Sequence, residues 1–506
     1  MLLTWVGISF LGSILGAIWP RRWVWQAVTL GQLGFGGIVG WTYLQRAPLE
    51  VSTTLSTLGF YQPWWGFPTP QGWSSRYLIG LSFATDGAAL LLGLSICLIG
   101  VILSLWPHWH FIQPRLQIPA LLILQGLVLW TTLSYDLLSF YIGFEAALFP
   151  MFYLILSLSP ATAEVRRTAI EFLLYTLLGS LPMLAGILYG ASEISRIHSV
   201  PFSTNFYDWL KNPLPPKVQE WVYAGFVLAF WVKLGLFPLH GWMLSLYQHA
   251  PLPVVVLSSA WLTKLGGIGW LRWGLLLPEG HFALAPFLGG AAVLSLTAAS
   301  LAAYFQKGLR QWLAMGSIAH LSLVPLGLAA TSPAGGSGAA WMLPIHTLLV
   351  SAHILIIDTL LRRTQTDQIS EMGGLASQTP QLTALWTLVA LASVGLPGLA
   401  QFPAEFLVLL GTYHSYTLKR GVFILALLSV LLSAAYTLPV LRRVLAGPSK
   451  ALDFSELRPQ EFIPLWVLGG LLIGLGFAAG PFLKEIARTV SPLMQAILYQ
   501  TLGVRL

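Results

Sequence analysis

Charged residues are scarce in this chain: Asp, Glu, Lys and Arg together make up 9% of its 506 residues. A soluble domain normally carries about 25% charged residues, so this composition excludes an ordinary soluble protein. Cysteine is nearly absent, because Cys97 stands alone inside an apolar run. A single cysteine excludes an intrachain disulfide and any metal site built on the usual cysteine spacing. We therefore interpret Cys97 as a core residue.

Motifs for nucleotides and cofactors are also missing. The sequence contains neither a Rossmann fingerprint nor a P-loop, so we expect no redox cofactor in this chain. The formal net charge of +8 would suit nucleic acid as a partner. The basic residues, however, occur in short pairs between apolar runs, where membrane topology places them, and we expect no nucleic-acid partner. No stretch between the runs is long enough to fold as a soluble domain, which argues against an enzyme with a soluble substrate.

Apolar runs dominate what is present. Hydrophobic residues make up 56% of the chain, and many runs reach the roughly 20 residues that a helix needs to cross a bilayer. The sequence therefore predicts an all-α membrane protein with about fourteen transmembrane helices. We expect spans at residues 2–19, 23–44, 78–106, 117–134, 137–158, 168–190, 219–248, 253–277, 283–304, 310–330, 339–361, 381–414, 420–443 and 461–483. The first span lacks a basic n-region and a small-residue cleavage site, so we expect it to be retained rather than removed as a signal peptide.

Two long connections separate these spans. The segment 46–77 is rich in Pro, Gly and Trp, and it predicts an interfacial loop because Trp favours the headgroup level of a membrane. The segment 192–218 predicts a polar loop. Lysine and arginine are slightly more frequent in loops that follow odd-numbered spans, which favours an orientation with both termini away from the cytoplasm or stroma.

Proline and glycine interrupt two of the expected spans. Gly235 and Pro238 break the seventh, and the run Leu-Pro-Gly-Leu-Ala-Gln-Phe-Pro at 396–403 breaks the twelfth. Proline removes a backbone donor and kinks a helix. In hydrocarbon such a break persists only where protein or a water-filled cavity satisfies the freed groups. The breaks lie five spans apart, which predicts two five-span repeats with a transport site near the paired breaks.

These repeats divide the chain into four expected parts. An N-terminal part holds the first three helices and the interfacial loop, two five-helix repeats follow, and a last helix with a tail completes the chain. The corresponding ranges are 1–110, 111–280, 281–447 and 448–506.

Ionisable residues lie inside several of the apolar spans. A charged residue at the bilayer centre costs about 2.5–3.5 kcal/mol on insertion scales, so each such position needs a reason. The candidate site residues are Glu145, Lys233, Lys264, His320, His346 and Glu405. His353 is also a span residue, but it lies in no recognisable motif, and we interpret it as structural.

A proton path is the function that this set favours. Burial moves the pKa of a carboxyl or an amine toward neutrality, so that either group can bind and release a proton. Glu145 and Lys233 would act as a switching pair, because separating them leaves Lys233 desolvated and inclined to lose its proton. Histidines between such stations can relay protons with little change of pKa. The structural alternative is that these groups only form salt bridges that orient the helices.

Several of these motifs together resemble a known family. The run Val232–Trp242, the run Thr263–Gly267 and the run Gln401–Phe406 are similar to motifs of the antiporter-like subunits of respiratory and photosynthetic complex I. The similarity is greatest to the NuoM/NdhD branch and extends from about residue 80 to about residue 450. It implies fourteen helices and two inverted five-helix repeats.

The resemblance also implies a role for each candidate residue. Glu145 and Lys233 would form the half-channel pair and Lys264 the central site. His320 and His346 would lie on the hydrated axis, and Glu405 would be the acid on the exit side.

The sequence departs from the family pattern at several positions. The family usually continues Leu-Pro-Asp-Ala-His after Trp242, whereas this chain has Met243–Tyr247 there and so loses an acid and an imidazole. Glu171 stands where the family often has lysine. Gly308 and Arg310 stand where the family has Asp and Lys. These changes suggest a specialised paralogue, of the kind that cyanobacteria carry in CO2-uptake forms of the complex.

The resemblance implies a proton-translocating subunit of an NDH-type plastoquinone oxidoreductase in a cyanobacterial thylakoid membrane. Such a chain is part of a proton-pumping enzyme with NAD(P)H or ferredoxin as donor, but carries no redox centre of its own. Its expected partners are the other membrane subunits of a hetero-oligomer, lipids and protons. The main alternative is a cation/proton antiporter subunit of the Mrp type. A passive scaffold that keeps the buried charges is a third.

Overall fold

The structure is a computed structural model that describes residues 1–45, 62–66, 77–78, 80–448 and 455–502. Its helices are α1 (Leu2–Ile18), α2 (Arg22–Leu44), α3 (Gly87–Leu105), α4 (Pro114–Leu133), α5 (Leu137–Ala146), α6 (Leu148–Leu158), α7 (Ala163–His198), α8 (Phe206–Lys211), α9 (Pro216–Leu234), α10 (Gly241–His249), α11 (Leu252–Val256), α12 (Thr263–Gly269), α13 (Pro278–Tyr304), α14 (Leu309–Ala329), α15 (Pro333–Thr364), α16 (Leu375–Gln378), α17 (Pro380–Ser393), α18 (Gln401–Tyr413), α19 (Arg420–Ala446), α20 (Pro459–Phe477) and α21 (Ala479–Leu502). Two π-helical segments, η2 (Leu257–Leu262) and η3 (Trp270–Gly274), and a short 3-10 helix, η4 (Ile369–Glu371), complete the helical part.

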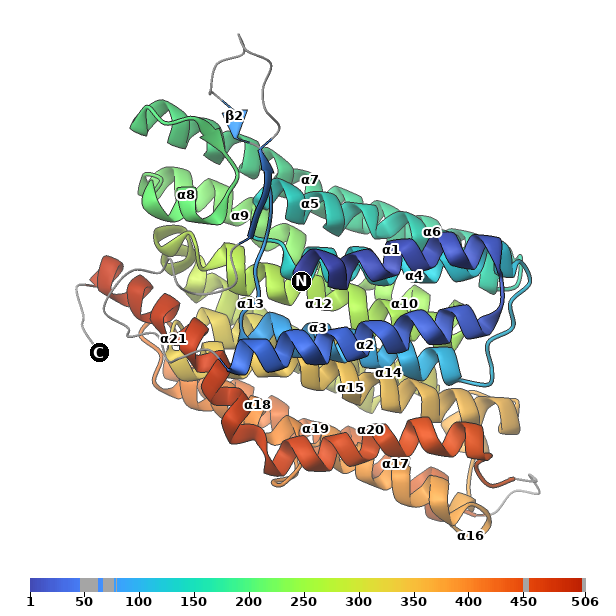
Figure 1. The fold of residues 1–506 in the computed structure, drawn as a ribbon. Helices are drawn as coiled ribbons and strands as arrows, with labels where there is room; N and C mark the ends of the chain where they lie inside the picture. Colours follow the sequence, from blue (N-terminus) through green and yellow to red (C-terminus); the bar gives the residue numbers. More distant parts are fainter. Residues whose placement is uncertain (46–61, 67–76, 79, 449–454, 503–506) are drawn as a thin grey trace.

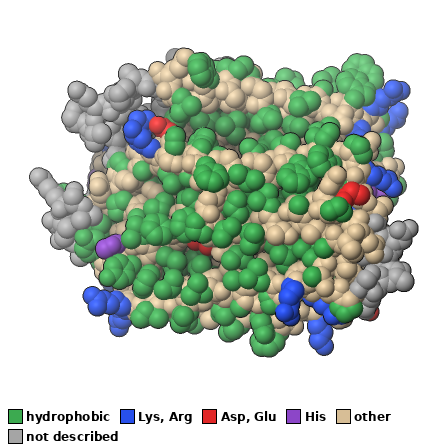
Figure 2. All heavy atoms as spheres, turned by 90° about the horizontal axis from the view of Figure 1, so that it is seen from below, with side chains coloured by type: hydrophobic (Ala, Val, Ile, Leu, Met, Phe, Trp, Pro, Cys, Tyr) green, Lys and Arg blue, Asp and Glu red, His purple; other side chains and the backbone are tan. Residues whose placement is uncertain are grey.

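Long helices run side by side through the molecule (Figure 1), and every expected span overlaps a helix or consecutive helical pieces. Among the described residues, ten helices are long and apolar enough to cross a membrane. On the face drawn in Figure 2, hydrophobic side chains cover the middle and most Lys and Arg side chains lie toward the two ends. These features confirm an all-α, multi-pass membrane architecture.

The centre of the bundle is occupied by three apolar segments. In the spans Leu252–Gly274, Leu309–Ala329 and Pro333–Thr364 every residue of an apolar 18-residue stretch is buried inside the chain, whereas only 28% of such a stretch is buried in Arg420–Ala446. A segment enclosed by protein can carry polar groups without exposing them to lipid. The central segments are therefore the places where buried ionisable residues are least costly.

Both predicted helix breaks are present. In the first, α9 ends at Leu234, Gly235 adopts a left-handed conformation with φ 69°, and α10 begins at Gly241. In the second, α17 ends at Ser393 and α18 begins at Gln401. Glycine is needed at Gly395 for its φ of 77° and because a Cβ there would collide with the Glu405 carboxylate.

The structure also contains short β-strands, which the all-α prediction did not include. Strands β1 (Gln62–Gly66) and β3 (Gly80–Phe83) pair in antiparallel fashion, and β2 (Tyr77–Leu78) pairs in parallel with β4 (Phe202–Ser203). The third helix consequently begins at Gly87 rather than at residue 78, because Asp86 caps it by accepting a hydrogen bond from the Ala89 amide. Most of the expected loop 46–77 lies outside the described residues.

Two predicted boundaries were wrong. Helix α7 continues to His198 instead of ending at the expected polar loop, because Glu193 and Arg196 pair on its exposed face and keep a polar stretch helical. The last span ends at Phe477, and the expected tail is a second helix, α21. Buried apolar residues spaced about one turn apart, including Ile486, Val490 and Met494, pack α21 against α3, α13 and α15.

Two irregularities were not predicted. The fifth span is divided into α5 and α6 at Ala147, two residues after Glu145. The eighth span contains the π-helical segments η2 and η3 on either side of α12, the piece that holds Lys264. Segments of π-helix are rare and frequently mark functional sites.

Candidate functional site

Lys264 lies at the centre of the molecule and is fully buried. Its Nζ donates hydrogen bonds to the Ser259 carbonyl at 2.6 Å and to Thr263 Oγ1 at 3.1 Å, and it lies 3.0 Å from His346 Nδ1. The acceptor carbonyl belongs to η2, five residues earlier in the chain. A charged ammonium has only donors, so while Lys264 is protonated His346 Nδ1 must act as the acceptor.

From His346 the polar contacts continue into the second half of the chain. His346 Nε2 lies 3.3 Å from Ser317 Oγ, and its ring centroid lies 6.1 Å from that of His320. With Nδ1 accepting from Lys264, Nε2 carries the proton and faces Ser317. Helices α14 and α15 supply these three side chains, and they belong to the wholly enclosed centre of the bundle.

The second helix break connects His320 to Glu405. His320 Nδ1 lies 2.8 Å from Gln401 Nε2, which also lies 2.7 Å from Glu405 Oε1. His320 Nδ1 and Glu405 Oε1 are themselves 3.6 Å apart. Gln401 and Glu405 occupy positions i and i+4 of α18, so the first turn after the break presents both side chains on one face.

The first half of the chain is arranged differently. Lys233 is 1% exposed, and its Nζ donates to the Phe144 carbonyl at 3.3 Å and lies 4.1 Å from the centroid of the Phe144 ring. Glu145 Oε1 is buried without a hydrogen-bond partner in the described part of the chain. Within 80–448 no ion pair of 4.0 Å or less joins Glu145 to Lys233. The structure therefore places the two expected partners as neighbours that are not in contact.

Lys233 and Lys264 lie on adjacent helices. Gly266 on α12 packs against the Lys233 side chain and the Phe230 carbonyl of α9. No hydrogen bond between described side chains links the two lysines. The candidate residues thus form one linked group, from Lys264 to Glu405, and one separate pair, Glu145 and Lys233.

The positions that depart from the family pattern lie around this group. Tyr247, where the family has histidine, is fully buried, and its hydroxyl accepts a hydrogen bond from Ser259 Oγ at 2.8 Å. Arg310 Nη1 donates to the carbonyls of Tyr247 and Ala250. At Gly308 the Asp367 carboxylate fills the space that a side chain would need. Partial burial raises the pKa of Asp367, against the hydrogen bonds and charge of Arg310.

Glu171, by contrast, lies at the periphery. Its Oε1 accepts from Arg167 Nε at 2.7 Å, one turn earlier on α7, and both side chains reach solvent or lipid. This exposed pair contributes little energy. The replacement of the family's lysine by Glu171 therefore alters the surface of the molecule and not the buried group.

Three residues of this site were not among the predicted ones. Gln401 bridges His320 and Glu405, Ser317 contacts His346, and Ser259 supplies the backbone carbonyl that holds Lys264. The signal for the first two was helical spacing, because Gln401 precedes Glu405 by four residues and Ser317 precedes His320 by three. Across the described ranges no group of three His, Cys, Asp or Glu is arranged to hold a metal ion.

Comparison with known proteins gives the family context. A model of the family described as NADH:quinone oxidoreductase/Mrp antiporter, transmembrane, matches residues 134–435. The NAD(P)H-quinone oxidoreductase chain 4 1 of Synechococcus sp. (strain JA-3-3Ab) is 33% identical over 469 residues, which cover 90% of this chain and 85% of that protein.

Solved structures show the same architecture. A chain of the respiratory complex I from Thermus thermophilus with bound NADH superposes with a TM-score of 0.85 at 28% identity, covering 98% of this chain and 100% of that one. A chain of the Mrp complex from Dietzia sp. superposes with a TM-score of 0.81 at 16% identity, covering 98% of this chain and 99% of that one, a likeness of fold alone.

Proposed function

This chain belongs to the NADH:quinone oxidoreductase/Mrp antiporter transmembrane family, and on that premise we propose that its buried residues carry protons across the membrane. It is an antiporter-like subunit of a complex I or NDH-type quinone oxidoreductase. As in its relatives, electron transfer is an activity of the whole complex. We place the redox chemistry in partner subunits and assign this chain proton movement without a redox centre of its own.

The observation that carries this proposal is the linked group from Lys264 to Glu405. Lys264, His346 and Ser317 are in hydrogen-bond contact, and so are His320, Gln401 and Glu405. Within each of these two sets the neighbouring polar atoms lie 2.7–3.3 Å apart, which is hydrogen-bond distance. Between the sets the rings of His346 and His320 lie 6.1 Å apart by their centroids, and a water molecule would carry the proton across that gap. All of these residues lie on helices that the rest of the chain encloses or on the first turn after a helix break.

The energy required is within reach of such a group. Moving one proton against about 100 mV costs roughly 2.3 kcal/mol. One pKa unit corresponds to about 1.4 kcal/mol, so a change of about two units in a buried group is sufficient. A change of charge or hydration in a neighbouring membrane subunit of the complex would cause this pKa change. No chemical reaction in this chain is then needed.

In this proposal Glu145 and Lys233 form the loading site of the first half. Lys233 is held by a backbone carbonyl and an aromatic face rather than by a carboxylate. The helix breaks after Lys233 and at Ala147 allow these side chains to approach and separate. Approach stabilises the charged lysine, and separation favours release of its proton toward Lys264.

We also propose which kind of quinone oxidoreductase complex contains this chain. Relatives from cyanobacteria bear the name NAD(P)H-quinone oxidoreductase chain 4, which supports a thylakoid membrane and plastoquinone as the electron acceptor. The changed positions around Tyr247 and Gly308 favour a specialised paralogue in a CO2-uptake form of the complex. Its partners would be the neighbouring antiporter-like subunits of a hetero-oligomer, in contact with lipid.

A cation/proton antiporter of the Mrp type is the less supported alternative. The family model covers both classes, but the likeness to the Mrp complex is one of fold alone. Sodium-dependent proton exchange in vesicles that lack redox partners would favour the antiporter.

The test is Lys264→Met in the intact complex, reconstituted into sealed vesicles. We expect fewer protons translocated per electron, because methionine keeps much of the side-chain volume but cannot bind a proton. Quinone reduction in the presence of an uncoupler shows whether the electron-transfer partners remain intact. An undiminished ratio of protons to electrons would exclude Lys264 from the path.

A further inference from the structure

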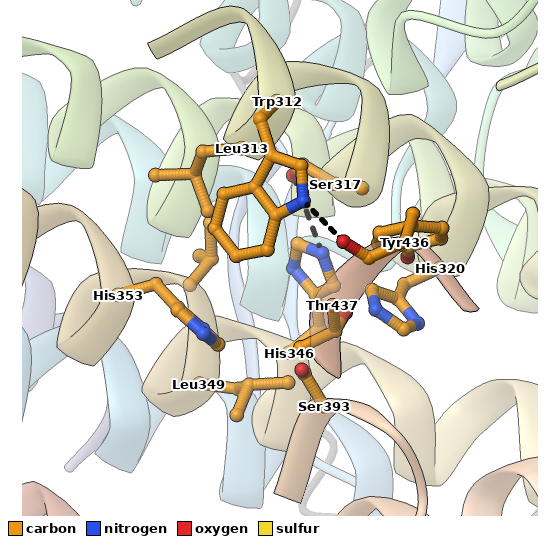
Figure 3. Close-up of a pocket in the computed structure, with 12 residues that line it drawn as sticks. Trp312, Leu313, Ser317, His320, His346, Leu349, His353, Ser393, Tyr436 and Thr437 are labelled. Atoms are coloured by element: carbon orange, nitrogen blue, oxygen red, sulfur yellow. Dashed lines mark hydrogen bonds between the residues drawn. The ribbon is translucent and has the colours of Figure 1, made fainter. Parts of the chain in front are cut away.

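A small cavity of about 30 Å³, enough for one or two water molecules, lies between α14, α15 and α19 (Figure 3). His320 and His346 line it, and both belong to the proposed path. His353, Trp312 and Tyr436 line it as well, and the proposed path does not use them. The cavity therefore extends the linked group toward residues whose role has to be explained.

His353 faces this cavity with an unpaired nitrogen. The residue is 3% exposed, and its Nε2 has no hydrogen-bond partner among the described residues. Its ring bonds to the backbone of Leu349 and lies against Trp312, with centroids 6.0 Å apart. His353 follows His346 by seven residues on α15, about two turns or 10.5 Å along the axis, so the two rings share one face of the helix. Figure 3 shows both rings directed into the common space.

Tyr436 presents a second unpaired group to the same cavity. Its hydroxyl is buried without a hydrogen-bond partner in the described part of the chain, while its carbonyl accepts from Trp312 Nε1 at 3.2 Å. An unsatisfied buried polar group costs about 1–3 kcal/mol, and nearly all such groups find a partner in the protein or in ordered water. Two unpaired groups that face one cavity, whose mainly apolar wall also carries the nitrogens of His320 and His346, indicate that water bridges them.

Another buried histidine provides the contrast. His281 is fully buried, but its Nδ1 lies 2.8 Å from the Tyr223 hydroxyl and its Nε2 lies 3.2 Å from Thr331 Oγ1. Both of its nitrogens are satisfied by side chains, as expected of a structural histidine. His353 has one nitrogen bonded to backbone and the other open to a cavity, which is the arrangement of a group that exchanges a proton.

The position of His353 shows toward which end of the bundle this cavity extends from His346. His353 is nearer than His346 to the end of the bundle where α14 begins and α15 ends, which carries Arg310, Arg362 and Arg363. We propose that His353 is a further proton-transfer residue, which passes protons through water in this cavity between His346 and that end of the bundle. This inference rests on the proposed function, and it gives the second half a branch of its own, separate from Glu145 and Lys233.

The test is His353→Gln in the intact complex in sealed vesicles, with His281→Gln as the matched control. Glutamine keeps a polar side chain but does not bind a proton at neutral pH. Since a positioned proton-transfer group contributes about 10²–10⁴-fold to a rate, we expect the initial rate of proton translocation to fall at least about tenfold. The solvent deuterium isotope effect on turnover should rise, whereas the control should change neither value.

A second variant keeps the proposal testable if His353→Gln prevents assembly. Tyr436→Phe removes only a hydroxyl that has no protein partner, so the complex should assemble, and translocation should slow because the water chain loses a contact. An unchanged rate in whichever variant assembles would overturn the branch. If Lys264→Met lowers translocation while His353→Gln does not, the branch fails and the proposed function stands; if Lys264→Met has no effect, both fail.

Discussion

The buried ionisable residues form two groups that differ in how they are connected: Glu145 and Lys233, here called the first half, and Lys264 to Glu405, here called the second half. From Lys264 to Glu405 the side chains are joined by hydrogen bonds or lie ring against ring. Between Glu145 and Lys233 there is no ion pair within the described ranges, and Lys233 instead bonds to a carbonyl. In the second half, therefore, only the space between the rings of His346 and His320 needs a water molecule for proton transfer, whereas the first half needs a movement of its side chains before transfer can occur.

The two helix breaks account for this difference. Lys233 lies on the last turn before the first break, where its side chain reaches back to the carbonyl of Phe144. Glu405 lies on the turn after the second break, where Gln401 is its neighbour at i−4 and Gly395 leaves room for its carboxylate. A helix break thus leaves the Lys233 side chain able to move in the first half, whereas in the second half it holds the Glu405 carboxylate in place.

The largest effect is expected from Lys233→Met, which removes the mobile cation of the first half. We expect coupled turnover of the complex to fall at least about tenfold, because the positioned group for proton loading is lost. Proton translocation and quinone reduction in sealed vesicles measure this directly. Full coupled turnover would mean that the second half takes up protons without the first. The assignment of proton loading to Glu145 and Lys233 would then be wrong.

A smaller effect is expected from Tyr247→Phe, at the junction of the halves. The Tyr247 hydroxyl accepts from Ser259 Oγ, but the Ser259 carbonyl that holds Lys264 is unaffected by the change. Loss of one hydrogen bond, worth about 1 kcal/mol, should slow translocation no more than roughly fivefold. The same vesicle assay applies. A loss as severe as that of Lys233→Met would instead make Tyr247 an essential relay in place of the missing imidazole.

The smallest effect is expected at Asp136, which anchors the start of α5 and so the helix that carries Glu145. Burial raises the pKa of Asp136 to about 6, against hydrogen bonds from Ser139 and Thr204 that favour the carboxylate. The folded chain therefore holds a proton that the unfolded chain releases, and this contribution to stability is lost as pH rises through about 6. It amounts to about 1–3 kcal/mol.

Asp136→Asn should flatten that pH dependence. Asparagine keeps the Oδ1 that accepts from the Ser139 amide and has no proton to lose. Thermal release of the subunit from the intact complex, followed between pH 5 and pH 7, should become less sensitive to pH than in the unmodified chain. Equal slopes for the two proteins would remove Asp136 as the cause.

Much of this arrangement could be predicted from the sequence because it depends on local chemistry. Apolar runs predict spans, and the prolines and glycines near residues 238 and 398 predict the breaks. The break at Ala147 and the π-helical turns around Lys264 were not predicted, although Pro150 follows the break by three residues and Gly266 and Gly267 lie between the π-helical segments. Proline and glycine occur in several unbroken helices of this chain as well, so tertiary packing decides which of them changes the helix. Helix α21 could have been predicted, because Ile486, Val490 and Met494 recur at helical spacing among polar residues, but its packing against α3, α13 and α15 could not.

The site was predicted as a set of residues, but its connections were not. Lys264, His320, His346 and Glu405 share one region, as expected, and their roles in proton movement stay predictions. The contacts of Gln401 with His320 and Glu405, and of Ser317 with His346, depend on which way neighbouring helices face, and a sequence does not specify that. His353 lies in no recognisable motif, so the sequence favours a structural role; the proposal gives it a role in proton transfer because its Nε2, unpaired among the described residues, opens to the cavity of His346.

The most direct test of the linked group is Gln401→Leu in the intact complex, which keeps every ionisable residue and removes only the amide between His320 and Glu405. Gln125→Leu, a change of another buried glutamine on α4 outside the group, is the control. The measurement is the number of protons translocated per electron in sealed vesicles. We expect a lower number for Gln401→Leu and no change for Gln125→Leu; an unchanged number for Gln401→Leu would contradict a proton path through the linked group.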